Sequence, residues 1–251
     1  MVAVARQEVA VLICSSDNRM DIVQRVLPSL FRFWPDCPYP IYVGLNSNCE
    51  LAPRVKTLVA QPSEWRKECF EQVAQISETH VIVLLDDFLI QQPVDTQRIT
   101  TLVDVALHSN ISYLRLMPFG KSSLKYLTAL MRMGDRGRIH MITKDRPFYS
   151  GLQIALWNRA HFMSLLQLRG SIWEFEHQRV LGVNHYVVTE NPAIQYSHLV
   201  EKGRWLPYAQ SLLKRAGLPA NLGERQVWSR WINMRLALDR VRLLVFGNAI
   251  N

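Results

Sequence analysis

Several motifs that identify common enzyme classes are absent from this chain of 251 residues. There is no Walker P-loop, no GxGxxG after the first predicted strand and no GxSxG nucleophile elbow. The commonest nucleotide hydrolases, dinucleotide-binding enzymes and esterases are therefore excluded. The cysteines form no CxxC pair and no cysteine–histidine cluster with zinc spacing, which argues against a structural metal site. No apolar run reaches the roughly 18 residues that a membrane-spanning helix needs.

The composition is that of a globular protein with a basic balance of charge. Hydrophobic residues make up 49% of the chain and charged residues 20%. Lys and Arg exceed Asp and Glu by 29 to 21, which suits anionic partners such as nucleotide phosphates, nucleic acid or an anionic membrane surface. The N-terminus has no signal-peptide pattern and the cysteines indicate a reducing compartment, so we expect a cytoplasmic protein.

Strand-like and helical patterns alternate through the first half of the chain. Apolar runs typical of buried strands lie at 8–14, 40–45 and 79–85, and helical periodicity lies between them at 21–33 and 63–76. This alternation predicts an α/β fold with a single doubly wound sheet flanked by helices. Later patterns extend it, with strand-like runs at 111–117, 148–157 and 186–188 and a helix at 159–168.

The last part of the chain is predicted to be helical. We expect one catalytic domain over 1–210 and a C-terminal helical extension over 211–251. Within this extension, 224–246 has apolar positions at helical spacing together with arginines and tryptophans. Such a helix fits binding at an anionic membrane surface, which would place the protein peripherally at the inner face of the membrane. A helix that packs on the domain with solvated arginines is an equal alternative.

Two adjacent acids follow a strongly apolar strand pattern. The run Val81–Leu85 leads directly into Asp86 and Asp87. In an open α/β sheet the carboxyl ends of the strands face the ligand crevice. The acids therefore indicate a site for a cation or a hydroxylated ligand. The alternative is an ordinary exposed turn or helix start, where acids are also favoured.

Glu174 and Glu176 form a second acidic cluster, next to Trp173 and Phe175. Bulky aromatic neighbours desolvate a carboxylate, which raises its pKa and suits it to accept a proton. In the alternative interpretation both glutamates lie at a helix N-terminus and are stabilised by the helix dipole.

In combination, these clusters resemble the nucleotide-sugar glycosyltransferases of the glycosyltransferase-A fold, family 2 type, including bacterial polysaccharide-assembly members. Ser16-Asp17-Asn18-Arg19 matches the first loop of that family, which commonly reads Thr-Tyr-Asn-Arg. Asp86-Asp87 matches the Asp-x-Asp or Asp-Asp motif after the central strand, and Trp173-Glu174-Phe175-Glu176 corresponds to the later motif that supplies the base. The resemblance spans about residues 8 to 205.

The resemblance implies transfer of a sugar from a nucleotide-diphosphate sugar to a hydroxyl group of a glycan or lipid-linked acceptor, with inversion. It also implies Mg²⁺ or Mn²⁺ held by Asp87, because a divalent cation neutralises the leaving diphosphate and prefers carboxylate oxygens. Asp86 would contact the ribose or the metal shell. Glu176 is the favoured base that deprotonates the acceptor hydroxyl, and Glu174 is the other candidate.

Further site residues are expected in the first loop, at the end of the second strand and in a late basic loop. The nucleotide would be bound by Ser15, Ser16, Asp17, Arg19 and Asn46. Lys202, Arg204 and Trp205 would close over the diphosphate and exclude water, or form a solvated basic turn. His198 is a candidate second metal ligand, with a structural histidine as the alternative.

Two positions depart from the family pattern. Phe88 follows the two acids, so Asp-x-Asp is not intact, and Asn46 stands where the family usually has an acid. These departures leave open a metal-independent enzyme, and a non-catalytic glycan- or membrane-binding module on the same fold is the alternative function. Nucleic acid is not an expected partner, because the basic stretch 119–147 has few aromatic residues for base stacking.

Overall fold

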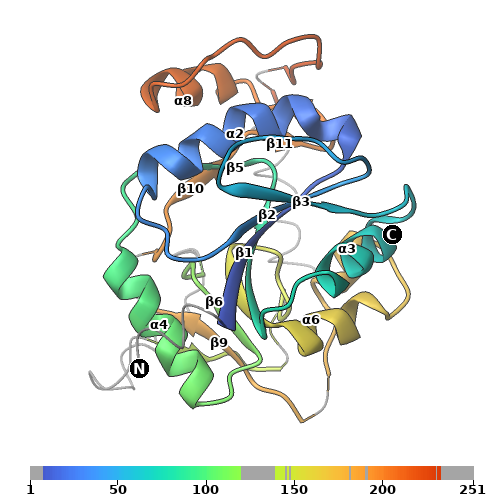
Figure 1. Ribbon diagram of the computed structural model, residues 1–251, viewed down its shortest axis with the longest axis vertical. Helices are drawn as coiled ribbons and strands as arrows, with labels where there is room; N and C mark the ends of the chain where they lie inside the picture. The colour runs from blue at the N-terminus through green and yellow to red at the C-terminus, as the bar shows by residue number, and fades with distance from the viewer. Residues whose placement is uncertain are drawn as a thin grey trace.

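The computed structural model describes residues 8–119, 139–144, 146, 148–180, 182–189, 192–229 and 231–232. Its centre is an eight-stranded mixed sheet with the strand order β3-β2-β1-β4-β8-β6-β9-β7. Helices cover both faces of this sheet (Figure 1). The predicted fold class, an α/β protein with one mixed sheet flanked by helices, is therefore confirmed.

The first half of the sheet is parallel and most of it is buried. It consists of β1 (Val9–Cys14), β2 (Ile41–Leu45), β3 (Val55–Val59) and β4 (His80–Leu85). All six residues of β1 are buried, because helices cover both faces of the strand. The edge strand β3 is more exposed and has only three apolar residues, so the sequence pattern did not predict it.

The second half of the sheet is mixed. It consists of β6 (Tyr113–Arg115), β7 (Ile139–Met141), β8 (Ala155–Asn158) and β9 (His185–Val188). β8 runs antiparallel to both β4 and β6, so β6 is parallel to β4 and both strands end at the same edge. The strand predicted over 148–157 begins only at Ala155, because Phe148 has a φ of 58° and its carbonyl accepts from Gly151 N in a turn.

The described helices form one layer on each face of the sheet, except for α8, which packs on the outer side of α2. They are α2 (Met20–Phe33), α3 (Trp65–Ala74), α4 (Thr96–His108), α6 (Arg159–Leu166), the short α7 (Ile172–Phe175) and α8 (Ala209–Arg215), with a 3₁₀ turn η1 (Asp17–Arg19) before α2. α2 and α4 pack on the face of β1 that carries Val9 and Val11, and α3 and α6 pack on the opposite face. Asn158 caps α6 as predicted, whereas α3 follows Glu64 rather than Ser63.

Two small antiparallel pairs lie beyond the main sheet. β5 (Phe88–Ile90) pairs with β10 (Tyr196–His198), and β11 (Val200–Glu201) forms a hairpin with β12 (Arg204–Trp205). α8 and this hairpin share a third apolar cluster with the outer side of α2, where Figure 1 shows α8 above α2. This third layer brings residues after 195 close to the first loop of the chain.

The helix predicted to begin at Glu224 does not begin there. Residues 224–229 are not helical, and two backbone hydrogen bonds join them to β12: Trp205 N donates to Gln226 O at 2.9 Å, and Trp228 N donates to Trp205 O at 2.8 Å. Since these backbone groups are committed to the hairpin, this segment cannot be a helix. Residues 233–246 of the predicted helix lie outside the described residues, as does most of the basic stretch 119–147.

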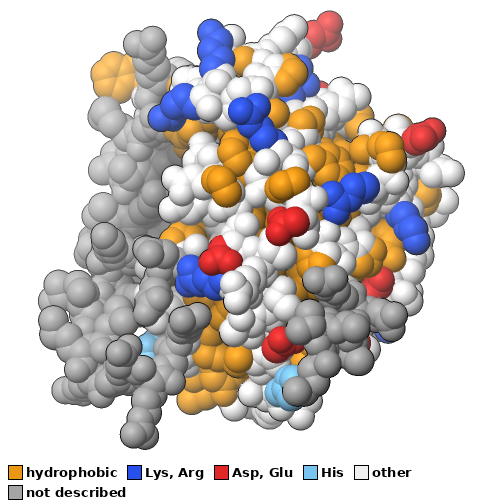
Figure 2. Space-filling model, turned by 60° about the vertical axis from the view of Figure 1, so that its left-hand side comes forward, with side chains coloured by type: hydrophobic (Ala, Val, Ile, Leu, Met, Phe, Trp, Pro, Cys, Tyr) orange, Lys and Arg blue, Asp and Glu red, His pale blue; other side chains and the backbone are white. Residues whose placement is uncertain are grey.

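Charged side chains of both signs are spread over the face seen in Figure 2, with Lys and Arg more frequent toward its top. Lys214 and Arg215, in the last turn of α8, are exposed. Within the described ranges, no helix combines the length and the apolar character needed to cross a membrane. The expected contact with an anionic membrane surface stays a prediction.

Candidate functional site

The polar residues predicted for the site gather at one edge of the sheet. β1, β2 and β4 are parallel, so the first loop, Asn46 and the two acids follow strand ends that lie side by side. A cavity of about 190 Å³ opens there. Its lining includes Ser15, Arg19, Asp86 and Asp87, with residues of α3 and α7 on the other side.

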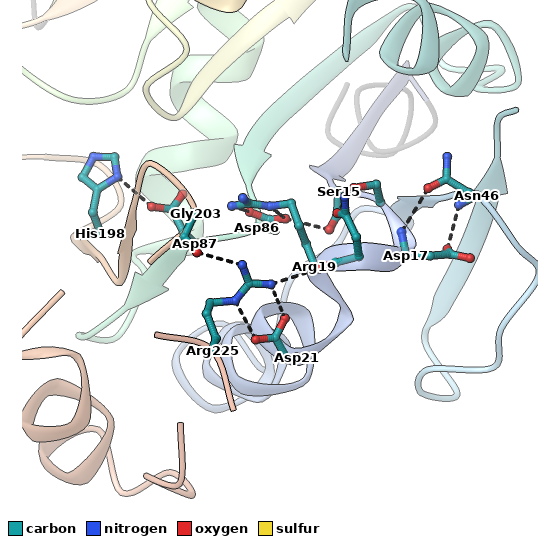
Figure 3. A network of polar contacts seen from close by, with 12 residues as sticks. Ser15, Asp17, Arg19, Asp21, Asn46, Asp86, Asp87, His198, Gly203 and Arg225 are labelled. Atoms are coloured by element: carbon teal, nitrogen blue, oxygen red, sulfur yellow. Dashed lines mark hydrogen bonds and ion pairs between the residues drawn. The ribbon is translucent and has the colours of Figure 1, made fainter. Parts of the chain in front are cut away.

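Asp86 is buried and bound on both carboxylate oxygens. Its Oδ2 accepts from Ser15 Oγ at 2.7 Å and Arg19 Nε at 2.5 Å, and its Oδ1 accepts from Arg19 Nη2 at 2.6 Å (Figure 3). Burial raises the pKa of Asp86, and the Arg19 guanidinium opposes that rise. Asp86 therefore anchors the first loop to the end of β4 through a charge-assisted, bidentate contact.

Asp17 and Asn46 tie the first loop to the end of β2. Asp17 Oδ1 accepts from Asn46 N at 2.8 Å and Ser47 N at 3.2 Å, and Asp17 N donates to Asn46 Oδ1 at 3.1 Å. Hydrogen bonds from Ser47 and Asn46 lower the pKa of Asp17. Ser16 Oγ donates to Asn18 Oδ1 at 2.8 Å within the loop. These contacts fix the conformation of the first loop.

Asp87 faces away from Arg19 and toward His198 on β10. Its Oδ2 lies 3.0 Å from His198 Nδ1, and the Asp87 carbonyl accepts from Leu199 N at 3.0 Å. The Asp87 side chain is 8% exposed and that of His198 is 41% exposed, so the pair has one accessible side. No group of three or more His, Cys, Asp or Glu side chains that could hold a metal occurs among the residues described.

The two glutamates have different environments. Glu176 follows α7 and its Oε1 accepts from Leu152 N at 2.8 Å. Burial raises the pKa of Glu176, and the hydrogen bond from Leu152 and the positive charges of Arg115 and His198 oppose the rise, so this carboxylate lies in the electrostatic field of His198. Its environment is that expected of a proton acceptor.

Glu174 is a helix-capping residue. It lies in the first turn of α7, and its Oε2 accepts from Ser171 N at 2.6 Å in a capping box. This hydrogen bond lowers the pKa of Glu174. Trp173 is 59% exposed and does not desolvate it. The alternative interpretation, a glutamate at a helix N-terminus, therefore describes Glu174 but not Glu176.

The late basic loop is a hairpin with a two-residue turn. Lys202 and Gly203 have φ values of 46° and 76°, as in a type I′ turn. Lys202 and Arg204 are exposed, and the Arg204 guanidinium lies 4.6 Å from the centre of the Trp228 ring. Trp205 is fully buried and its Nε1 donates to Leu222 O at 2.9 Å. Trp205 thus anchors the hairpin in the core, which corrects its expected contact with substrate.

Arg225 is a site-organising residue that the sequence did not reveal. Its guanidinium makes a two-point ion pair with Asp21, with both contacts at 2.7 Å, and donates to Gly203 O and Asn18 O at 2.9 Å each (Figure 3). One side chain thereby joins the hairpin, the first loop and α2. Arg115 was not predicted as a site residue either, although a charged residue within the apolar run Ile111–Met117 could have indicated one.

The fold and the site define an α/β protein with a polar cleft at the carboxyl ends of its parallel strands. No protein-family model matches the sequence, and no curated protein does.

Solved structures are similar to this chain at low identity. Residues 1–349 of TarS from S. aureus align with a TM-score of 0.42 and 10% identity, covering 72% of this chain and 60% of that chain. A cytidylyltransferase from Leptospira borgpetersenii aligns with a TM-score of 0.47 and 10% identity over 98% of this chain and 99% of that one. TarS 1–349 in complex with UDP aligns with a TM-score of 0.43 and 11% identity, covering 74% and 61%. Such scores do not establish a family, so the function must be argued from the chain's own residues.

Proposed function

We propose that this chain is a nucleotide-sugar-dependent glycosyltransferase. It would move a sugar from a nucleotide-diphosphate sugar to a hydroxyl group of a glycan or lipid-linked acceptor, with inversion. The observation that carries the proposal is the pair of Asp87 and His198, 3.0 Å apart, together with the partly buried carboxylate of Glu176, on which the charge of His198 acts. This arrangement would bring a cation-binding group and a proton acceptor close together.

Glu176 is the proposed base. Its raised pKa favours uptake of a proton from the attacking acceptor hydroxyl, because the protonated carboxyl group is easier to bury than the carboxylate. Glu174 is exposed and committed to Ser171, so it does not share this role. The proton would move from the acceptor oxygen to Glu176 as that oxygen attacks the anomeric carbon and the diphosphate departs.

The donor set at Asp87 fits Mg²⁺ or Mn²⁺. Such ions are often held by one or two protein ligands, with the remaining positions filled by substrate phosphate oxygens and water. Asp87 Oδ2 and a His198 ring nitrogen would be the protein ligands. When bound, the ion would supply positive charge next to the leaving diphosphate. Asp86, which is ion-paired with Arg19, would support the first loop and contact the ribose.

The remaining residues would surround the nucleotide. Ser15 and Ser16 line the cleft, and Asn46 holds the neighbouring Asp17 in place through their hydrogen bonds. Lys202 and Arg204 would bring positive charge over the diphosphate, because both are exposed on a short hairpin beside the first loop. Arg225 would keep that hairpin in place.

Titration calorimetry with uridine, cytidine, guanosine and adenosine diphosphates tests the proposal directly. At least one nucleotide is expected to bind in the presence of Mn²⁺, and Asp87→Asn should weaken that binding by about ten-fold or more, since a lost charged contact costs about 1.5–3 kcal/mol. Asp36→Asn, at an exposed acid away from the cleft, is the matched control. If none of the four nucleotides binds, the proposal fails.

A non-catalytic glycan-binding module is the second candidate, favoured by the neutralisation of Asp86 by Arg19 and by Asn46 in place of an acid. Such a module would bind immobilised glycans equally well after Asp87→Asn and Glu176→Gln are combined. The enzyme predicts that the same double variant loses sugar transfer while its fold, followed by circular dichroism, is unchanged.

A further inference from the structure

Cys14 and Cys69 form a pair of free thiols in contact with each other. Cys14 is the last residue of β1, and Cys69 lies in the middle of α3. Their sulfur atoms are 3.7 Å apart, and either thiol can donate the hydrogen bond between them. The thiols of Cys37 and Cys49 each donate to a backbone carbonyl instead. The fold therefore brings together two cysteines that are 55 positions apart in the chain.

Both cysteines of this pair line the cavity at the carboxyl edge of the sheet, together with Ser15, Ser16 and Asp86. Cys14 is 5% exposed and Cys69 is 2% exposed, so a reagent would reach their sulfur atoms through this cavity. Its volume is about 190 Å³, several times the roughly 30 Å³ that a water molecule occupies in the liquid. A small oxidant such as hydrogen peroxide therefore fits beside the two thiols.

Two neighbouring thiols and one peroxide have a balanced route to a disulfide. The sulfur of one deprotonated thiol attacks a peroxide oxygen, the O–O bond breaks, and a sulfenic acid and water form. The sulfur of the second thiol then attacks the sulfenic sulfur, the S–O bond breaks, and the S–S bond forms as a second water leaves. Two electrons pass from the sulfur atoms to the peroxide, so two thiols and one H₂O₂ give one disulfide and two waters.

The environment of the pair makes this reaction slow rather than impossible. The hydrogen bond with Cys14 and burial raise the pKa of the Cys69 thiol, and a thiolate is the reactive form. The contact between the sulfur atoms has the opposite effect on the second step, because the resolving thiol is already in place beside the sulfenic acid. A sulfenic acid formed here should therefore end as a disulfide rather than as a more oxidised acid.

The disulfide would change the shape of the cavity. An S–S bond is about 2.05 Å long, so the two sulfur atoms must approach by about 1.7 Å from their separation of 3.7 Å. Ser15 follows Cys14 directly, and its hydroxyl donates to Asp86 at 2.7 Å. Gln72, one turn after Cys69 in α3, donates to the Ser15 carbonyl at 3.4 Å. Movement of either sulfur is thus transmitted to the first loop.

We propose that Cys14 and Cys69 are a redox-modification site, at which a peroxide forms a disulfide that weakens nucleotide binding in the cleft. The disulfide follows from the position of the two cysteines alone. Its effect on nucleotide binding rests on the proposed function. In a reducing compartment such a disulfide is transient, because small thiols and dithiols reverse it by exchange.

Peptide mapping of the full chain tests the modification site. The reduced protein is treated with hydrogen peroxide, the remaining thiols are alkylated in denaturant, and the digest is analysed by mass spectrometry without reduction. The wild type is expected to give a peptide pair linked through Cys14 and Cys69 that disappears after treatment with dithiothreitol. Cys69→Ala should lack this pair, and the double variant Cys37→Ala with Cys49→Ala, the matched control, should retain it.

Absence of the linked pair in the wild type would overturn the proposal, whether both thiols stay reduced or are oxidised to sulfinic acids. A disulfide that involves Cys37 or Cys49 in place of this pair would also overturn it. If Cys69→Ala fails to fold, the map of the wild-type protein decides, because it needs no variant.

Calorimetry with the four nucleoside diphosphates and Mn²⁺, on desalted reduced and oxidised protein, tests the effect on binding. The oxidised wild type should bind about ten-fold more weakly or worse, and dithiothreitol should restore its affinity. Peroxide should not change the affinity of Cys69→Ala. Equal affinity of reduced and oxidised wild type overturns the effect on binding. If the reduced protein binds none of the four nucleotides while the linked pair still forms, the proposed transferase fails and the redox-modification site stands.

Discussion

Replacing Arg19 by Ala should destabilise the fold through Asp86 rather than through lost packing. The Asp86 side chain is 3% exposed and that of Arg19 is 31% exposed. Removing one partner of a buried ion pair costs about 3–5 kcal/mol because it leaves the other charge buried and unpaired. The partial exposure of Arg19 and the remaining hydrogen bond from Ser15 place the expected loss at the lower end, about 3 kcal/mol.

Urea unfolding followed by circular dichroism measures this loss, and a double-mutant cycle assigns it. Arg19→Ala combined with Asp86→Asn should recover more than half of the lost free energy of unfolding, because the neutral amide no longer needs a cation. Arg54→Ala serves as the matched control, since Arg54 bonds backbone carbonyls and no acid, and should cost about 1 kcal/mol. A loss below about 1 kcal/mol for Arg19→Ala, with no coupling to Asp86→Asn, would refute this reasoning.

Three other predictions concern the stability of the fold. Burial lowers the pKa of His161 and of His185 to about 4, below the ordinary value near 6.5, so the unfolded chain binds more protons between these values. The free energy of unfolding should therefore be constant above about pH 6.5 and fall toward pH 4, by at most about 3 kcal/mol per ring. In urea unfolding of His161→Asn, its dependence on pH should be weaker than in the wild type, and an unchanged dependence would contradict this account. Trp205→Ala should cost about 3–5 kcal/mol in urea unfolding, since the ring is fully buried, whereas a neutral effect would mean that the hairpin is not anchored. Gly203→Ala should lower thermal stability by about 1 kcal/mol through backbone strain alone, since φ is 76° and no atom lies within 4 Å of the added Cβ; a stabilised variant would be inconsistent with the turn.

The parallel core was predictable because its strands are buried on both faces. The sequences of β1 and β4 are nearly continuous apolar runs, which in a globular chain predict strands buried on both faces. The edge strand β3 is partly exposed and was missed. The segment 224–229 has helical periodicity but pairs with β12, so a long-range contact overrode a local pattern that the sequence does carry.

The candidate site was predictable where topology alone places residues together. Because parallel strands share a carboxyl edge, Asp86 and Asn46 could be assigned to one cleft without any knowledge of packing. The roles of individual side chains could not be assigned in this way. Burial of Trp205, the bridging contacts of Arg225 and the effect of Arg115 on Glu176 all depend on which distant elements pack beside them. Glu174 and Glu176 are two residues apart, yet one is exposed and caps a helix and the other is partly buried.

The most direct test of the central claim is a crystal structure of the protein soaked with uridine diphosphate and MnCl₂, with anomalous scattering used to locate the metal. The proposed transferase predicts one manganese ion that bridges Asp87 and the diphosphate, with the nucleotide lying over Ser15, Ser16 and Asp17. A nucleotide bound elsewhere, or a manganese ion that does not contact Asp87, would contradict it.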